Sequence, residues 1–406
     1  MTTEDTRRRV LLAMVSATTV PDAAAMRAFS DEDWQAIGRM ARQHRLVPLL
    51  HDLLADRGSD WPVPDSLRQQ WATLHRQAVL RVLEVQQTLR RACRVLAAQG
   101  QAHAALKGAW LAFHCYDQPV HRPMADVDLL MLPEGALAAF AALEQAGFVR
   151  RSKGAQQALE NALVHDKHLP PLALHGGRVP MELHTRVVHD PPDARLAGTI
   201  ADSAALLART QNFDLGGVQV PCLSPTDALL HQVVHAVCDH HLDHGPLVLL
   251  DIAVILRKCA IDWPRYLAMA ELGGWQRGSE LLLQLTQAYH GDLPIPTEAL
   301  GQSLDAAMLD AAALLLLVDK RHAGDLQFRA DLHGDGSLGG KLAFLWQRAV
   351  PQRHVLASFA KVPANTWQVW LHYPAWLLDR SQRRLLEDRN RGDQNRLLAL
   401  EQWLRG

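Results

Sequence analysis

The stretch Asp126–Leu132 (DVDLLML) constrains the fold more than any other part of the chain. Two aspartates, one residue apart, stand at the start of an otherwise apolar run, which is typical of a buried strand. Alternate side chains of a strand point to the same side, so Asp126 and Asp128 should share one face. Two neighbouring carboxylates repel each other unless a cation lies between them. Mg²⁺ fits, because it prefers oxygen ligands and usually shares its shell with substrate phosphates.

The residues around this run predict a small α/β unit. Short apolar or alternating runs indicate further strands, and they are separated by a turn and two helical patterns. The expected order is strand Ala102–Leu106, turn Lys107–Gly108, helix Ala109–Tyr116, strand Asp126–Leu132, helix Pro133–Gly147, and strands Phe148–Arg151 and Val179–Val187.

Helical patterns flank the unit on both sides. A capping box at Ser30–Asp33 opens an early helix, and a long amphipathic pattern runs from about Ser66 towards Ala98. Ser224 followed by Pro225 is a strong helix start, and helical patterns continue from there, with a surface loop expected at Gly334–Gly340. Three regions are predicted: N-terminal helices (1–98), an α/β core (99–222) and C-terminal helices (223–406).

Residues near the two aspartates suit phosphate binding. The Lys107–Gly108 turn leads into a helix, so glycine would let the backbone approach a phosphate at the helix N-terminus. Lys107 and Arg122 could add cationic contacts. On the strand Val179–Val187, Glu182 and His184 share one side. If this strand lies beside Asp126–Leu132, Glu182 supplies a third carboxylate and a candidate base. The alternative is that these acidic groups only mark solvent-facing strand starts.

Composition narrows the function. The formal net charge is -1, which argues against a broad electrostatic grip on nucleic acid. Five scattered cysteines without a CxxC pair favour a reducing compartment. Neither a signal-peptide core nor a membrane-spanning apolar stretch is evident, so a cytoplasmic location without membrane association is expected.

A histidine-rich segment allows a second interpretation. His231 and His235 lie four residues apart, a spacing that can bind zinc, and His240, His241 and His244 follow. With Asp239 or Asp251 they could form a metal-hydrolase site. The simpler interpretation is that this helix packs over the α/β unit, its histidines line a pocket, and Asp251 caps or pairs.

Together these motifs resemble the uncharacterised nucleotidyltransferase family of the polymerase-β-like superfamily, over most of the chain. The matching residues are Leu106-Lys107-Gly108, Arg122, Asp126-Val127-Asp128-Leu129-Leu130, Glu182-Leu183-His184, His231–His241 and Asp251. The resemblance implies an α+β fold, with a small mixed-sheet nucleotidyltransferase-like core embedded in N- and C-terminal helical regions. The chain departs from the wider superfamily at two positions. It has Lys107–Gly108 where glycine-serine is usual, and Glu182 where aspartate is usual.

The resemblance also implies a reaction. Asp126, Asp128 and Glu182 would hold two Mg²⁺ ions and carry catalysis, while Lys107, Gly108, Arg122 and His184 would bind a nucleoside triphosphate. The expected activity transfers a nucleoside monophosphate to an acceptor hydroxyl on a small molecule, peptide or protein. Similar proteins are often encoded with genes for the biosynthesis of peptides or other natural products, which favours a peptide acceptor. Two alternatives stay open: a weakly active or inactive nucleotide- or partner-binding protein on the same fold, and a histidine-site metal phosphohydrolase.

Overall fold

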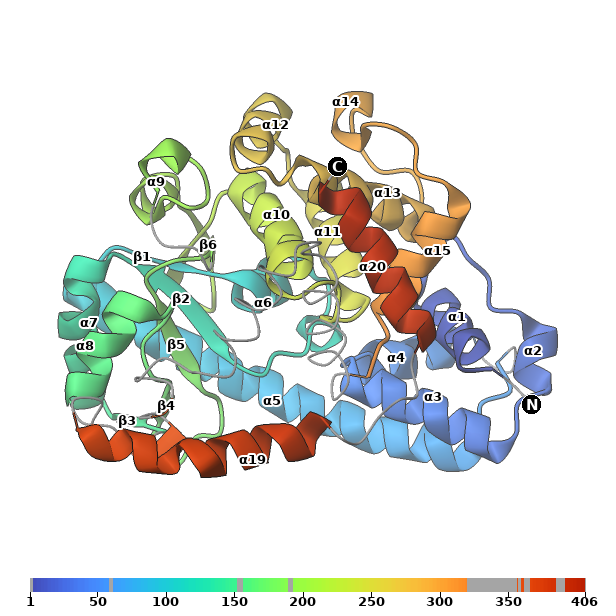
Figure 1. The fold of residues 1–406 in the computed structure, drawn as a ribbon, viewed down its shortest axis with the longest axis horizontal. Helices are drawn as coiled ribbons and strands as arrows, with labels where there is room; N and C mark the ends of the chain where they lie inside the picture. The colour runs from blue at the N-terminus through green and yellow to red at the C-terminus, as the bar shows by residue number, and fades with distance from the viewer. Residues whose placement is uncertain are drawn as a thin grey trace. The chain divides into compact units, whose positions relative to one another are not determined.

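The computed structural model of the chain describes residues 3–57, 61–151, 156–188, 193–319, 356, 359–360, 366–384 and 391–405. The chain divides into two compact units, Met1–Leu309 and Asp310–Gly406 (Figure 1). The first unit contains the N-terminal helices, the whole sheet and the helices that follow it. The predicted boundaries at residues 98 and 222 fall inside this unit and stay a prediction.

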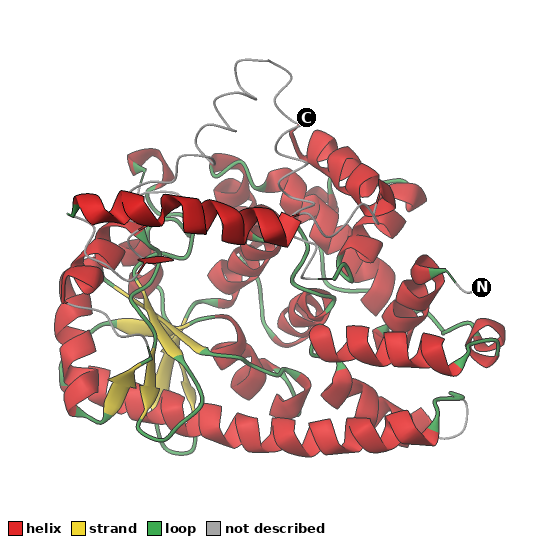
Figure 2. Ribbon diagram, turned by 60° about the horizontal axis from the view of Figure 1, so that its bottom comes forward, coloured by secondary structure: helices red, strands yellow, loops and turns green. Residues whose placement is uncertain are grey.

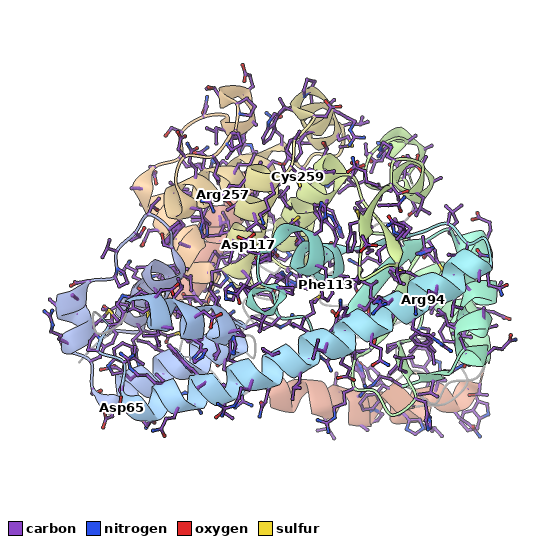
Figure 3. All side chains as sticks on the ribbon, turned by 180° about the vertical axis from the view of Figure 1, so that it is seen from behind. Asp65, Arg94, Phe113, Asp117, Arg257 and Cys259 are labelled. Atoms are coloured by element: carbon purple, nitrogen blue, oxygen red, sulfur yellow. The ribbon has the colours of Figure 1, made fainter. Side chains whose placement is uncertain are left out.

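Helices form the N-terminal part of the first unit. They are α1 (Glu4–Val15), α2 (Ala23–Arg27), α3 (Asp31–Gln43), α4 (Val47–Arg57) and α5 (Asp65–Ala98). The predicted capping box is present at α3: the Ser30 side chain accepts from the Asp33 backbone, and the Asp33 carboxylate accepts from the Ser30 backbone. In Figure 3 the long helix α5 starts at Asp65, and Arg94 lies close to its C-terminal end.

The strands of the first unit form one seven-stranded mixed sheet, in the order β3-β4-β5-β2-β1-β7-β6. Figure 2 shows this sheet in yellow among the helices. Its strands are β1 (His103–Ala105), β2 (Val127–Met131), β3 (Phe148–Arg150), β4 (Leu172–Leu174), β5 (Met181–His184), β6 (Gln211–Asp214) and β7 (Gln219–Cys222). β2 pairs antiparallel with β1 and parallel with β5. This sheet among helices confirms the predicted α+β class and the adjacency of the two acidic strands.

Helices between the strands complete the α/β unit. After β1 the chain forms α6 (Lys107–Trp110), the π-helical segment η2 (Leu111–Cys115) and the short turn η3 (Pro119–His121). Helix α7 (Pro133–Gln145) follows β2, and α8 (Gln156–His165) follows β3. The short helical segments η4 (Ala194–Leu196) and α9 (Ser203–Ala208) lie between β5 and β6.

A second helical group follows the sheet within the first unit. It consists of α10 (Pro225–Val234), the π-helical segment η5 (His235–Asp239), α11 (Leu247–Lys258), α12 (Trp263–Leu272), α13 (Gln276–His290) and α14 (Thr297–Leu300). The Ser224 hydroxyl caps α10 as predicted, by accepting from the Asp227 backbone. Helix α11 contacts η2, and Figure 3 marks this region with Phe113 on η2 and Arg257 and Cys259 at the end of α11.

The remaining helices lie near or beyond the unit boundary. Helix α15 (Ala306–Leu315) crosses the boundary, and η6 (Trp367–His372), α19 (Tyr373–Arg384) and α20 (Arg391–Arg405) belong to the second unit. Leu356, Val369 and Trp376 pack together there as a small apolar cluster. The loop expected at Gly334–Gly340 lies outside the described residues. Among the residues that are described, every helix is too short or too polar to cross a membrane.

Candidate functional site

The pairing of β2 with β5 brings two acidic residues together. In this parallel register Asp128 lies directly opposite Glu182, and Leu129 lies opposite Leu183. Paired residues on neighbouring strands point to the same face of the sheet, so both carboxylates lie on one side. His184, two residues after Glu182, is on that side too. The sequence predicted that Glu182 and His184 share one side of their strand, and the register sets that side beside Asp128.

Asp128 is buried and holds two cationic groups. Its Oδ2 lies 3.0 Å from the Lys107 Nζ, and its Oδ1 lies 3.1 Å from the His184 Nε2. Burial alone would raise the pKa of Asp128, but Lys107 and His184 outweigh it and hold that pKa well below its usual value. Asp128 is therefore a fixed negative charge at the centre of the site.

Asp126 comes immediately before β2 and is only partly buried. Burial and the negative charge of Asp128 raise its pKa, although Lys107 acts against them. The raised pKa of Asp126 reflects the repulsion expected between two closely spaced carboxylates.

Glu182 is the more accessible carboxylate of the strand pair, with 22% of its side chain exposed. Its Oε2 lies 3.6 Å from the Nε2 atoms of both His168 and His184. His168 comes from the loop that precedes β4, and it forms an isolated bridge with His184. Glu182 thus keeps access to solvent while two imidazoles limit the positions that its side chain can adopt.

The turn at Lys107 and Gly108 has a backbone geometry that the sequence did not predict. Lys107 itself adopts the left-handed backbone conformation, with φ of 47°. This unusual conformation for a residue with a side chain starts α6 directly after β1. A Cβ on Gly108 would lie 2.8 Å from the Met124 Cγ, so the glycine is required for close packing beside the site.

Arg122 is fixed by a buried ion pair. Its Nε donates to Asp251 Oδ1 at 2.7 Å and to Oδ2 at 2.9 Å. The Tyr116 hydroxyl donates to the same Oδ1 at 2.7 Å. Asp251 raises the pKa of Arg122 against the opposing effect of burial, so the guanidinium stays charged. The prediction that Asp251 pairs is confirmed, and its partner is the arginine that was expected to contact phosphate.

These groups surround one pocket of about 220 Å³. All of the predicted site residues except His184 line it: Lys107, Gly108, Arg122, Asp126, Asp128 and Glu182. Sequence reasoning missed Arg45, which lies in the turn between α3 and α4 with φ of 61°. His235, His240 and His244 line the same pocket, which agrees with the simpler interpretation that histidines of this segment line a pocket. The pocket therefore combines carboxylates and cations of the α/β core with residues from both helical regions.

Comparison with protein families identifies the chain. A family model described as an uncharacterised nucleotidyltransferase matches residues 30–291. The chain belongs to this family. The matched range begins at α3 and ends just after α13, so it covers every residue of the pocket. No curated protein matches the chain. Family membership supports nucleotidyltransferase activity in general terms, with a nucleotide as substrate.

A nucleotidyltransferase usually requires divalent metal ions, and the carboxylate groups of this pocket suit them. Ligand atoms of Asp128, Glu182 and His184 all lie within 4.8 Å of one another. Asp126 adds a further carboxylate to the pocket lining. Carboxylate oxygens are the protein ligands that Mg²⁺ prefers, and this ion usually keeps coordination positions for substrate phosphates and water. The donor set therefore fits Mg²⁺.

Proposed function

We propose that this chain is a metal-dependent nucleotidyltransferase that moves a nucleoside monophosphate from a nucleoside triphosphate to an acceptor hydroxyl. The observation that carries the proposal is the register of β2 and β5, which sets Asp128 opposite Glu182 beside Lys107 in one pocket. Membership of the nucleotidyltransferase family supports the same reaction class. The acceptor that we propose is a small molecule or a peptide, since the net charge of -1 gives little attraction for a polynucleotide.

Asp126, Asp128 and Glu182 would hold two Mg²⁺ ions. Such ions make an acceptor hydroxyl more acidic and offset negative charge on the attacking and leaving oxygens. Burial keeps Asp128 in one position, and Lys107 and His184 fix both of its oxygens. This arrangement would hold the ligands in place before the substrate arrives, which reduces the reorganisation needed during the reaction.

Glu182 is the proposed general base. It is the partly exposed carboxylate of the paired strands, so it can accept the proton of an entering hydroxyl. The acceptor oxygen forms a bond to the α-phosphorus, and the bond from that phosphorus to the oxygen of the β-phosphate breaks. Pyrophosphate leaves with the bonding electrons, and the acceptor proton passes to Glu182.

Cations around the pocket would bind the triphosphate. Lys107 and Arg45 both line it. The pair Lys107–Gly108 stands where the resemblance implies glycine-serine, so Lys107 would replace the missing serine as a phosphate ligand. Arg122 is held by Asp251, which fixes its guanidinium at the wall instead of letting it swing into the pocket. Lys107 and Arg45 are therefore the proposed phosphate ligands, and Arg122 contributes a fixed positive potential.

Pyrophosphate release from each of the four common nucleoside triphosphates with Mg²⁺ tests the proposal, together with binding of fluorescent analogues. We expect Asp128→Asn and Glu182→Gln to reduce turnover at least about 100-fold, the size of effect seen for essential acid–base groups. The matched control is Asp65→Asn, which changes a carboxylate at the start of α5 (Figure 3). Failure of all four triphosphates to bind would refute the proposal.

A second candidate is a nucleotide-binding protein without turnover. The observation that favours it is the ion pair between Lys107 and Asp128, since the ammonium group lies where a metal ion would contact this carboxylate. Magnesium-dependent binding of a triphosphate without pyrophosphate release, over a panel of peptide and small-molecule acceptors, would select this candidate.

For the active enzyme we propose a cytoplasmic location, which suits its five free cysteines.

A further inference from the structure

Three histidine side chains converge in the pocket that the carboxylates also line. His235 belongs to η5, while His240 and His244 lie in the loop that joins η5 to α11, between the helices labelled α10 and α11 in Figure 1. Their ring centroids are 4.2–4.6 Å apart. One nitrogen from each ring lies within 4.8 Å of the corresponding nitrogens of the other two. His235 is buried, and the other two are partly buried.

An unusual backbone brings these residues together. The π-helical turn η5 ends at Asp239, and His241 and Leu242 then adopt left-handed conformations with φ of 44° and 66°. Consecutive left-handed residues with side chains are disfavoured and persist only where the surroundings enforce them. Leu242 is fully buried, and its backbone N–H donates to the Ala236 carbonyl at 2.8 Å. The chain is therefore folded back so that His244 returns to His235.

Two carboxylates lie beside the three imidazoles. The Asp239 Oδ2 is 3.3 Å from the His235 Nδ1, and Lys167 fixes Asp239 through a 2.8 Å contact. The Asp243 Oδ1 is 3.3 Å from the His240 Nδ1 and 4.0 Å from the His244 Nδ1. Metal-binding histidines commonly present one ring nitrogen to a carboxylate and use the other for the metal. With Asp243 beside the Nδ1 atoms of His240 and His244, and Asp239 beside that of His235, the Nε2 atoms are the ligands that we expect for a metal.

We propose that His235, His240 and His244 form a binding site for a divalent transition-metal ion of the zinc class, separate from the carboxylate group. Imidazole ligands suit zinc and its neighbours, whereas Mg²⁺ prefers oxygen, so the two sites should select different ions. In a tetrahedral site with Zn–N bonds of about 2.0–2.1 Å, ligand nitrogens are roughly 3.3 Å apart. The observed nitrogens lie within 4.8 Å of one another, so metal binding would draw the three rings closer together.

Three protein ligands leave a fourth position open, as in catalytic zinc sites. The histidines line the same pocket as Asp126, Asp128 and Glu182, so that position faces the substrate space. We infer that it takes an oxygen or sulfur atom of the acceptor and orients it. This part rests on the proposed nucleotidyl transfer, whereas metal binding by the three histidines does not.

The test is to titrate the chelator-treated full chain with zinc, without nucleotide. Isothermal calorimetry measures the affinity, and elemental analysis measures the amount of zinc bound. We expect one equivalent of zinc on the wild type at this site, and a loss of affinity of about 100-fold or more in His240→Asn/His244→Asn. Asp243→Asn, which removes only the supporting carboxylate, should weaken binding roughly 10–100-fold. X-ray absorption should show three nitrogen ligands at about 2.0–2.1 Å.

Two controls separate this site from others. A second group of metal-capable side chains, His51, Asp52 and His75, lies elsewhere in the first unit, and His75→Asn should leave the equivalent assigned to the pocket unchanged. Asp128→Asn should reduce nucleotidyl transfer at least about 100-fold and still bind zinc, so failure of one proposal is distinguishable from failure of the other. No zinc binding by the wild type, equal binding by the double variant, or loss of this equivalent in His75→Asn would overturn the proposal.

Discussion

Asp251→Asn tests whether the buried pair with Arg122 holds the pocket wall in place. The substitution removes the negative charge, keeps the shape of the side chain and leaves an oxygen that can still accept from Tyr116. Arg122 is 11% exposed and Asp251 is 3% exposed, so the remaining guanidinium charge is poorly solvated. Its other hydrogen bond, from Nη1 to the Pro123 carbonyl, is long at 3.3 Å.

The expected loss of unfolding free energy is about 3–5 kcal/mol, the cost of leaving one partner of a buried ion pair uncompensated. This is a large part of the roughly 5–15 kcal/mol that stabilises a typical protein. Tyr116→Phe removes one hydrogen bond to the same carboxylate and should cost about 1.5–3 kcal/mol. This milder variant keeps the test informative if Asp251→Asn accumulates too little folded protein.

Urea denaturation followed by circular dichroism measures both losses. The matched control is Glu144→Gln, which breaks the much more exposed pair between Glu144 and Arg150 and should cost about 1 kcal/mol or less. The double variant Arg122→Met/Asp251→Leu removes both charges. It should therefore be less destabilised than the sum of the single variants Arg122→Met and Asp251→Leu. An Asp251→Asn variant within 1 kcal/mol of the wild type, or strictly additive losses, would refute the reasoning.

Two further predictions concern packing and pH. Gly108→Ala should cost about 1–3 kcal/mol, because its new methyl group meets the Met124 side chain, and Met124→Ala in the same chain should recover part of the loss in a thermal melt. Burial, with a smaller contribution from Arg257, lowers the pKa of His290 from 6.5 to about 4. The unfolded chain therefore binds the proton more readily than the folded chain. The neutral, buried His290 leaves the free energy of unfolding undiminished above pH 6.5, and this free energy falls as the pH drops towards 4. Between about pH 7 and pH 5 the loss is roughly 2 kcal/mol, and urea titrations of His290→Gln should show a pH dependence weaker by that amount.

The sequence predicted the acidic centre because its determinants are local. Alternation along the two strands assigns Asp128 and Glu182 to defined faces, and a one-residue slip in register would bury the wrong set of side chains. The strands β4, β6 and β7 were missed. Each has only three or four residues, and β6 carries three polar residues out of four, so periodicity gives little signal.

Long-range contacts set the remaining part of the site. Lys107 pairs with Asp128, and Arg122 pairs with Asp251 across 129 residues of sequence, through packing that no local pattern encodes. The His231–His235 spacing suggested a metal pair, whereas the metal-capable group is His235 with His240 and His244. Their convergence depends on the left-handed backbone at two non-glycine residues, His241 and Leu242, which composition does not reveal.

Because Lys107 forms an ion pair with Asp128, we expect it to have opposite effects on the affinity for a metal ion and on the affinity for a nucleotide. Lys107 lies 3.0 Å from the Asp128 Oδ2 and competes there with a divalent cation, yet the same ammonium group is the proposed phosphate ligand. Lys107→Met should therefore raise the affinity for Mg²⁺ without nucleotide about tenfold, since removing a nearby like charge of this kind is worth about 1 kcal/mol or more.

The same variant should lower the affinity for the Mg²⁺–triphosphate complex about tenfold or more, because a charge-assisted contact to phosphate is lost. Calorimetric titrations with Mg²⁺ alone and with the complex measure the two effects separately. Lys258→Met is the control, since Lys258 is 40% exposed and pairs with Asp117, which Figure 3 labels beyond η2. A parallel fall in both affinities would show that Lys107 organises the carboxylates and does not compete with the metal. If both affinities are unchanged, Lys107 has no role in binding either the metal ion or the nucleotide.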